Sequence, residues 1–163
     1  MKKYNVAILG ATGAVGREMM KILAERDFPL AELHLLASER SVGKKLPFKD
    51  QQIEVELACD EAFANMDIVL GAAANAVAKR FAPAIKAAGA VFVDNSSAFR
   101  MDPDVPLIVP EINPEDAKKH NGIIANPNCS TIITVTAVNA LNKLSPIRTM
   151  IASAYQAVSG AGA

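Results

Sequence analysis

The chain has 163 residues, of which 51% are hydrophobic and 21% charged, proportions typical of a globular protein with one domain, or one domain and the start of another. Seventeen basic residues balance seventeen acidic residues, so the net charge gives no reason to expect binding to nucleic acid or to an anionic membrane. No apolar run approaches the roughly 20 residues that span a bilayer. The two cysteines, Cys59 and Cys129, are too few for a disulfide framework and predict thiols in a reducing cytoplasm, and we expect no metal site.

Strands and helices alternate through the first 94 residues. Short apolar runs predict strands, and the stretches between them predict two helices, the second kinked or restarted at Pro83. The apolar face of the first helix consists of Val15, Met19, Ile22 and Leu23. This alternation predicts a Rossmann-like, doubly wound α/β fold with a mostly parallel sheet. The expected strands are residues 4–9, 33–37, 53–57, 67–72 and 90–93, and the expected helices are residues 13–26 and 76–88.

The second part of the chain does not continue the regular alternation of strands and helices, and it begins with a polar loop at residues 95–106. A final strand without a partner and a glycine-rich turn at the terminus indicate that the chain is incomplete. We therefore expect a cofactor-binding Rossmann-like domain over residues 1–128 and the beginning of a truncated α+β substrate domain, for catalysis and dimerisation, over residues 129–163. The expected strands here are residues 107–109, 122–125 and 148–158, and the expected helices are residues 114–120 and 129–144.

A glycine turn, Gly10-Ala11-Thr12-Gly13-Ala14-Val15-Gly16, separates the first strand from the first helix. Glycine lets the backbone turn tightly and lie close to a pyrophosphate. The unpaired N–H groups and the partial positive charge of the helix start favour a phosphate there. The spacing is GxxGxxG rather than GxGxxG, and alone it also fits a plain strand-to-helix turn. Its position after a strand and before an amphipathic helix favours a dinucleotide site.

The end of the second strand indicates which dinucleotide is bound. NAD sites usually have an acidic residue there to hold the ribose hydroxyls, and Glu39 is a candidate for that role. Arg40 instead offers a planar fork of donors for a 2′-phosphate, with hydroxyls from Ser38 and Ser41 beside it. A solvated loop is a third interpretation of the same charges. We favour NADP as the cofactor.

The segment Asn126-Pro127-Asn128-Cys129-Ser130-Thr131 combines turn residues with a cysteine at the start of a helix. A helix N-terminus stabilises a thiolate through its dipole and its unpaired N–H groups. A thiolate is the nucleophile that an attack on an aldehyde or an acyl phosphate needs. Cys59, in an ordinary Leu-Ala-Cys-Asp context, is instead expected to be a buried small hydrophobe.

A second polar segment, Asp94-Asn95-Ser96-Ser97-Ala98-Phe99-Arg100, follows a parallel strand at the carboxyl edge of the sheet. Ligands of such sheets bind at that edge. Arg100 either binds an anionic substrate group or pairs with Asp102 or Asp104, and the residues alone leave both possibilities open.

The chain offers no convincing general base. His34 lies in an apolar strand and is expected to be packed there. His120 ends a polar helix beside Asn121-Gly122 and is expected to cap it at the surface. We do not expect either histidine to act as the base.

These motifs occur together in one family. The glycine turn GATGAVG, the segment ASERSVG, the block VDNSSAFRMDPDVPLIVPEIN, the segment NPNCSTI and the terminal YQAVSGAG resemble aspartate-semialdehyde dehydrogenases, in order and across nearly the whole chain. The related N-acetyl-glutamyl-phosphate reductases usually have a glycine before the cysteine and a tyrosine after it. Asn128 and Ser130 occupy those positions here, which argues against that family.

The resemblance implies an activity and a set of site residues. The activity is the NADPH-dependent reduction of β-aspartyl phosphate to aspartate semialdehyde with release of phosphate, a step towards lysine, threonine and methionine carried out by a cytoplasmic homodimer. Cys129 would be the nucleophile that forms a thioester, Arg100 would bind phosphate, and Gln156 would orient the substrate. Contacts to the cofactor would come from Gly10, Thr12, Gly13, Ala14, Val15, Arg40, Ser41, Ser159 and Gly160.

Two features depart from the family pattern. Many members have a serine- and glycine-rich stretch where this chain has Gly71-Ala72-Ala73-Ala74-Asn75, so the cofactor contact made there differs in this chain or belongs to a subgroup. Family members also continue well beyond residue 163 into a substrate and dimerisation domain that supplies the histidine base, so we expect this chain alone to be inactive. The alternatives are a stand-alone nucleotide-binding module and an enzyme similar to N-acetyl-glutamyl-phosphate reductase.

Overall fold

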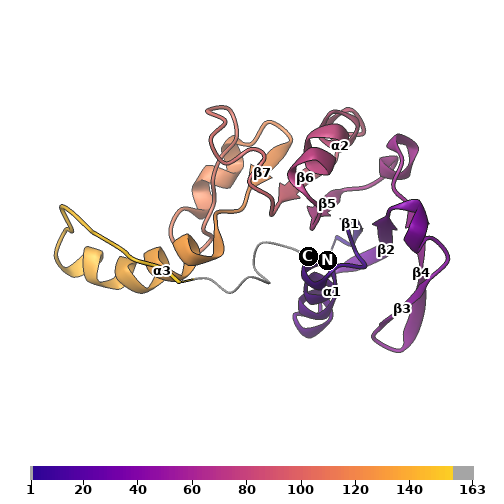
Figure 1. Ribbon diagram of the computed structural model, residues 1–163, viewed down its shortest axis with the longest axis horizontal. Coiled ribbons are helices and arrows are strands. Elements are labelled where there is room, and N and C mark those ends of the chain that lie inside the picture. The colour runs from indigo at the N-terminus through magenta and orange to yellow at the C-terminus, as the bar shows by residue number, and fades with distance from the viewer. Residues whose placement is uncertain (1, 156–163) are drawn as a thin grey trace.

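A seven-stranded sheet forms the centre of the protein (Figure 1). The computed structural model describes residues 2–155. The strand order is β3-β4-β2-β1-β5-β6-β7, and all neighbouring strands are parallel except β3 and β4. The prediction of a Rossmann-like, mostly parallel α/β sheet is therefore confirmed. The strands are β1 (Tyr4–Leu9), β2 (Leu30–Ala37), β3 (Lys45–Phe48), β4 (Gln51–Leu57), β5 (Ile68–Gly71), β6 (Val91–Asp94) and β7 (Ile123–Ala125).

Helices lie on both sides of this sheet, as parallel strands with crossover connections require. α1 and α2 lie on opposite sides, while α3 projects away from the sheet and has no buried residue (Figure 1). None of the helices within residues 2–155 is both long and apolar enough to cross a bilayer. The α-helices are α1 (Ala14–Glu25), α2 (Asn75–Ala87) and α3 (Cys129–Leu144), and the 3₁₀ helices are η1 (Glu39–Ser41), η2 (Asp60–Phe63) and η3 (Pro114–Lys119).

The chain reverses its direction of winding at β1. This strand pairs with β2 on one side and with β5 on the other, so the chain first builds the β2–β4 half and then crosses over to build the β5–β7 half. In open parallel sheets, ligands bind in the crevice that such a reversal leaves at the carboxyl ends of the strands. The topology alone therefore places the candidate site at the end of β1.

The face of the sheet covered by α2 contains an aromatic core. Phe63 and Phe81 make an edge-on contact with ring centroids 5.4 Å apart, and Phe92 of β6 is fully buried in the same cluster. α2 continues without a break through Pro83, whose side chain is exposed. Burial of these rings holds α2, and with it the loop that precedes its first residue, against β5 and β6.

The face of α1 that meets the sheet agrees only in part with the predicted one, in which Leu23 is buried and Met19 packs against the core as expected. Its buried residues are Gly16, Met20 and Leu23, whereas Val15 and Ile22 are 44% and 40% exposed. The apolar pattern could not include a glycine, yet Gly16 is the residue that brings the helix backbone against the end of β1. Because of this contact, the buried residues of α1 lie about one position further along the helix than the apolar pattern predicts.

Three predicted elements in the second part of the chain differ in the structure. No strand is present over residues 148–155, and residues 156–158 of that predicted strand lie outside the described residues. Ile151 is 95% exposed, because no neighbouring strand supplies a hydrogen-bonded ladder or an apolar face. Residues 107–109 contribute only an isolated bridge from Leu107 to Ala125. The helix near residues 114–120 is a 3₁₀ helix, and the helix at 129–144 has the predicted bounds.

β3 has no counterpart among the predicted elements. Its turn to β4 uses Lys49 with a φ of 50°, a conformation that glycine, asparagine or aspartate usually supplies. Because Lys49 is not a typical residue for this conformation, nothing in the sequence indicated a turn there, and β3 was missed within a polar stretch. Lys49 also forms an ion pair of 2.6 Å with Asp27 in the turn after α1, so the hairpin is tied to the end of that helix.

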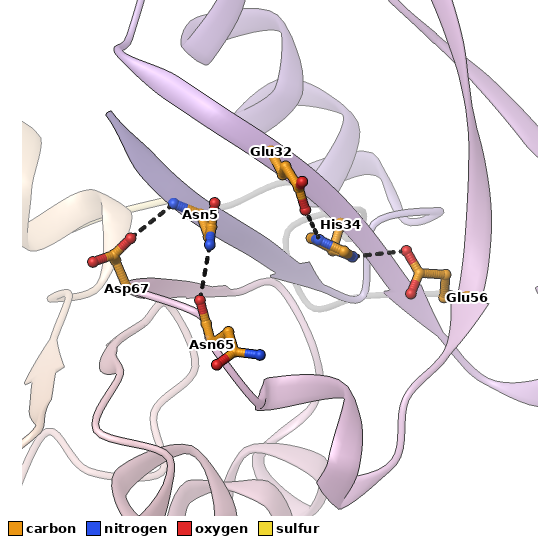
Figure 2. A network of polar contacts seen from close by, with 6 residues as sticks. All are labelled: Asn5, Glu32, His34, Glu56, Asn65 and Asp67. Atoms are coloured by element: carbon orange, nitrogen blue, oxygen red, sulfur yellow. Dashed lines mark hydrogen bonds and ion pairs between the residues drawn. The ribbon is translucent and has the colours of Figure 1, made fainter. Parts of the chain in front are cut away.

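Asp67 joins the start of β5 to the start of β1. Its Oδ2 accepts the backbone N–H of Asn5 at 2.9 Å, and the Asn5 amide donates to the carbonyl of Asn65 at 3.0 Å (Figure 2). Lys2 lies 3.2 Å from the other carboxylate oxygen. The Asn5 N–H, and then Lys2, hold the pKa of the Asp67 carboxyl below its ordinary value.

We expect the Asp67→Asn variant to lose less stability in acid than the unaltered chain. A carboxyl whose pKa is lowered by folding contributes stability above the pKa of the unfolded chain, about 4, and that contribution is lost as the pH falls through the folded pKa. The free energy of unfolding, measured in urea between pH 7 and pH 3, should therefore fall less steeply in the variant. Asp50→Asn, at an exposed turn, is the control, and an equal slope for Asp67→Asn and the unaltered chain would contradict the assignment.

Candidate dinucleotide and thiol site

Six parallel strands end at the same edge of the sheet, and five of them, β1, β2, β5, β6 and β7, lead into the candidate site. The register aligns Leu9 with Gly71, Gly71 with Asp94, and Asp94 with Ala125, and β2 ends one residue beyond the partner of Leu9. The segments that follow these ends are the glycine turn after β1, η1 after β2, residues 72–75 after β5, residues 95–100 after β6 and residues 126–129 after β7. The predicted site residues within the described part of the chain all belong to this edge.

The glycine turn is built by close backbone contacts. Gly10 has a φ of +91°, and a Cβ on it would lie 2.6 Å from the carbonyl oxygen of Ala72. The N–H of Gly10 donates to the carbonyl of Leu36 at 2.8 Å, which joins the turn to β2. A Cβ on Gly16 would lie 2.4 Å from the carbonyl oxygen of Gly10. Only glycine fits at positions 10 and 16, for reasons that concern the fold itself.

Gly13 has a different role, because the fold leaves room for a side chain there. A Cβ on it would lie 3.5 Å from the Gly10 carbonyl oxygen, an ordinary contact, and its φ of −74° and ψ of 167° suit any residue. Gly13 is also the N-cap of α1, and no side chain among residues 2–155 caps the helix. The open N–H groups of the first turn can therefore receive an anion, and the missing Cβ at Gly13 lets that anion come close.

Arg40 and Ser41 lie beside this turn, in η1 at the end of β2. Arg40 is exposed, and within residues 2–155 its guanidinium forms no ion pair. Glu39, the alternative ribose ligand, is also exposed in the same 3₁₀ helix. The geometry therefore leaves the Arg40 guanidinium available to an anionic group next to the glycine turn.

The segment after β6 is held by a fully buried carboxylate. Asp94 accepts hydrogen bonds from the backbone N–H of Ser96 at 3.1 Å and from its hydroxyl at 2.6 Å. Asn75, the first residue of α2, donates to the Ser97 hydroxyl at 2.7 Å and accepts the Ser97 N–H at 3.0 Å. Asn75, where this chain departs from the serine- and glycine-rich pattern of the family it resembles, thus ties the start of α2 to the loop.

Arg100 makes neither of the carboxylate pairs considered from the sequence. Within the described residues, its Nε donates to the carbonyl of Asn126 at 2.9 Å and its Nη2 donates to the carbonyl of Asn95 at 3.0 Å. Both acceptors are neutral backbone groups, and they belong to two different loops of the edge. The guanidinium therefore keeps its charge uncompensated by these contacts and retains further N–H donors for an anion.

Cys129 is the first residue of α3, as predicted, and it is exposed. Asn128 caps the helix: its Oδ1 accepts the N–H of Ser130 at 3.0 Å. This side chain satisfies one of the open N–H groups, and the thiol shares the helix start with the others. Cys59 is half-buried in the turn before η2 rather than fully buried as predicted.

Both histidines are engaged away from this edge. The ring of His34 lies between two carboxylates, with its Nδ1 2.9 Å from Glu56 and its Nε2 3.3 Å from Glu32 (Figure 2). His34 is therefore part of a polar cluster across β2 and β4, and it is not packed in apolar surroundings as predicted. His120 ends η3, and its Nδ1 accepts the N–H of Gly122 at 3.0 Å, as expected of a helix cap.

The sequence did not single out Asn95, Asn126 or Arg17. Asn95 and Asn126 each follow a buried strand directly, and the amide of Asn126 donates to Oδ1 of Asn95 at 2.6 Å. Arg17 donates from Nε to the carbonyl of Thr12 at 3.2 Å, which braces the glycine turn. The signal that could have found the two asparagines is their shared position, one residue past neighbouring parallel strands. Three predicted site residues, Gln156, Ser159 and Gly160, lie outside the described residues.

The described residues contain no group of three or more histidine, cysteine or acidic side chains placed to hold a metal ion. A glycine turn at the switch point of a parallel sheet, followed by an uncapped helix, defines a dinucleotide-binding α/β domain. The same edge also carries an exposed cysteine, Cys129, at the start of a helix.

The family description "Semialdehyde dehydrogenase, NAD binding domain" matches residues 5–120, and the chain belongs to this family. Aspartate-semialdehyde dehydrogenase of Synechocystis sp. is 56% identical over 158 residues, which cover 97% of this chain and 47% of that protein. The chain thus spans about half the length of the curated relatives it matches.

Solved structures of the same family share the fold. Aspartate semialdehyde dehydrogenase II from Vibrio cholerae, complexed with ASA, superposes with a TM-score of 0.84 at 44% identity over 87% of this chain and 47% of that one. The enzyme from Candida albicans, determined with NADP, gives a TM-score of 0.69 at 27% identity over 90% of this chain and 48% of that one. Sequence and structure therefore agree on the family that the motifs indicated.

The last two glycines of the turn, Gly13 and Gly16, provide a matched pair of variants. We expect Gly16→Ala to lower the free energy of unfolding by about 2 kcal/mol, because its Cβ must displace backbone that has no room to move. Gly13→Ala should lower that free energy by no more than about 1 kcal/mol, since its Cβ meets only ordinary contacts and the remaining cost is that of alanine at an N-cap, while its affinity for a dinucleotide falls. Urea unfolding and a binding titration measure both, and a Gly13→Ala variant that unfolds as easily as Gly16→Ala would contradict the division of roles.

Proposed function

We propose that the chain is the NADP-binding and nucleophile-bearing part of an aspartate-semialdehyde dehydrogenase. The observation that carries this proposal is the placement of the glycine turn and of Cys129 at one edge of one parallel sheet. The reaction is the reduction of β-aspartyl phosphate by NADPH to aspartate semialdehyde, with release of inorganic phosphate and NADP. The cofactor supplies a hydride to the acyl carbon.

Cys129 performs the covalent step. Its thiolate attacks the acyl carbon of β-aspartyl phosphate, the bond to the phosphate oxygen breaks, and phosphate leaves as the thioester forms. The thioester fixes the acyl carbon at the start of α3, at a set distance from the cofactor edge. After reduction, the carbon–sulfur bond breaks and the thiolate is released with the aldehyde. Protonation and deprotonation of the thiol require a base that we assign to the part of the protein beyond these residues.

Arg100 is suited to the phosphate. Two of its N–H groups hold the carbonyls of Asn95 and Asn126, which orients the plane of the guanidinium without neutralising it. The remaining N–H groups form a charge-assisted site close to the residues before Cys129. A role for Gln156 in orienting the substrate remains a proposal from the family resemblance alone.

A bound dinucleotide would be held along the edge from β2 towards β7. Adjacent strands are about 4.8 Å apart, so β2 and β7, four intervals apart, are separated by roughly 19 Å, a span that the two ends of an extended dinucleotide bridge. The backbone of Gly10, Thr12, Gly13, Ala14 and Val15 would hold the pyrophosphate, and Arg40 with Ser41 would hold the 2′-phosphate. Ser159 and Gly160 complete this set by family resemblance.

The division between two domains falls at the start of α3. We propose that residues 1–128 form the cofactor domain and that residues 129–163 begin a catalytic and dimerisation domain. The exposed apolar side chains of α3, Ile133, Leu141 and Leu144, support this division, because a helix that is complete in itself buries such residues. The whole enzyme is a cytoplasmic homodimer that serves the synthesis of lysine, threonine and methionine.

Arg40→Ala should weaken the binding of NADPH far more than the binding of NADH. The guanidinium contacts only the 2′-phosphate, and loss of a charge-assisted contact of this kind costs roughly 2 kcal/mol, or about thirtyfold in affinity. Fluorescence titration of both cofactors measures the ratio. Arg26→Ala, at the far end of α1, should leave both affinities unchanged, and equal losses for NADPH and NADH in Arg40→Ala would refute the assignment.

Turnover separates the proposed function from the alternatives. The 163-residue chain should bind NADP but give no phosphate-dependent reduction of NADP with aspartate semialdehyde, whereas the protein extended to the length of its relatives should give it. Extended protein that binds NADP yet acts on neither aspartate semialdehyde nor N-acetyl-glutamate semialdehyde would favour a stand-alone binding module. Faster turnover of the N-acetyl-glutamate substrate would favour the related reductase.

A further inference from the structure

Two asparagines occupy equivalent positions on neighbouring strands. Asn95 directly follows β6 and Asn126 directly follows β7, and each extends the parallel ladder by one residue. The N–H of Asn95 donates to the Gly71 carbonyl at 3.1 Å, and the N–H of Asn126 donates to the Asp94 carbonyl at 2.8 Å. These are the last backbone ties between the sheet and the two loops.

The side chains then join the two loops to each other. Nδ2 of Asn126 donates to Oδ1 of Asn95 at 2.6 Å, and both residues are half-buried. Arg100 also joins the two loops, because its guanidinium donates to the backbone carbonyls of both asparagines. Asn126 is thus held through its N–H, its side-chain amide and its carbonyl.

Only two residues separate Asn126 from Cys129. Pro127 is buried and its ring fixes φ, and Asn128 is occupied as the cap of α3. This short and stiff connection transmits the position of Asn126 directly to the start of the helix. α3 itself has no fully buried residue, and this connection is the stretch of main chain that joins the sheet edge to the thiol.

We propose that Asn126 is a positioning residue for Cys129, and that it acts through its amide bridge to Asn95. The bridge holds the start of α3 against the loop that carries Arg100, so that the nucleophile and the anion site keep one geometry. This inference rests on the proposed role of Cys129 as the nucleophile. It assigns a function to two residues that contact neither substrate nor cofactor in the proposed reaction.

The reactivity of the thiols tests this proposal without substrate, cofactor or turnover. Cys129 and Cys59 of the 163-residue chain are alkylated with iodoacetamide between pH 6 and pH 10, and each rate is followed by peptide mass spectrometry. Cys59 lies in a different loop and serves as the internal standard. In the unaltered chain Cys129 should react faster than Cys59 at neutral pH, because its thiolate shares a helix start.

Asn126→Leu removes the side-chain bridge but keeps the two backbone ties, so the fold should persist. We expect the Cys129 rate profile to move to higher pH, with a rate about threefold lower at pH 7, since the thiolate loses part of its fixed orientation to the helix terminus. The Cys59 profile should not move. Asn95→Leu breaks the same bridge from the other side and should give the same change, and the double variant should add nothing further.

Asn121→Leu, at an exposed position two residues before β7, is the matched control and should leave both profiles unchanged. Unchanged Cys129 profiles in both single variants, or changes that add up in the double variant, would overturn the proposal. A parallel shift of Cys129 and Cys59 would also overturn it, because that result reports general destabilisation. Failure of the turnover assay with the expected thiol shifts intact would instead count against the proposed function.

Discussion

The end of β1 is the place where the backbone has least freedom. Gly10 turns with a φ of +91°, and a Cβ there would meet the carbonyl of Ala72, while a Cβ on Gly16 would meet the carbonyl of Gly10. The turn, the first helix and the continuation of β5 therefore meet without side chains between them. This contact fixes the N-terminus of α1 at the point where the sheet reverses its winding, and the rest of the candidate site is arranged around it.

On either side of β1, the segments that follow the strand ends carry the polar and charged groups of the candidate site. Hydrogen-bonded spacing of the strands sets their separations: η1 with Arg40 lies on the β2 side, and the loop before Cys129 lies on the β7 side. The loops between them are held by hydrogen bonds of the buried Asp94 with Ser96 and of Asn75 with Ser97. Such contacts orient the loops without consuming the charge of Arg40 or Arg100, which a ligand with phosphate groups requires.

The sequence predicted most of this architecture because its signals are local. Apolar runs located six of the seven strands within a few residues, and the glycine turn, Arg40 and Cys129 were found from residue type and position. β3 was missed because Lys49 adopts a left-handed turn without a turn residue, and the face of α1 was misjudged in part because a glycine makes its closest contact. The partners of Arg100 and His34 depend on long-range contacts, Asn126 and Glu56, which no local pattern specifies.

The central claim is that one sheet edge presents the nicotinamide end of NADP to Cys129 and the adenine end to β2. A nitroxide attached to Cys129 in a Cys59→Ser background tests it directly, through the relaxation of the protons of bound NADP. The account predicts that the nicotinamide protons relax faster than the adenine protons, with both effects lost when the nitroxide is reduced. Faster relaxation of the adenine protons, or equal relaxation at both ends, would contradict it.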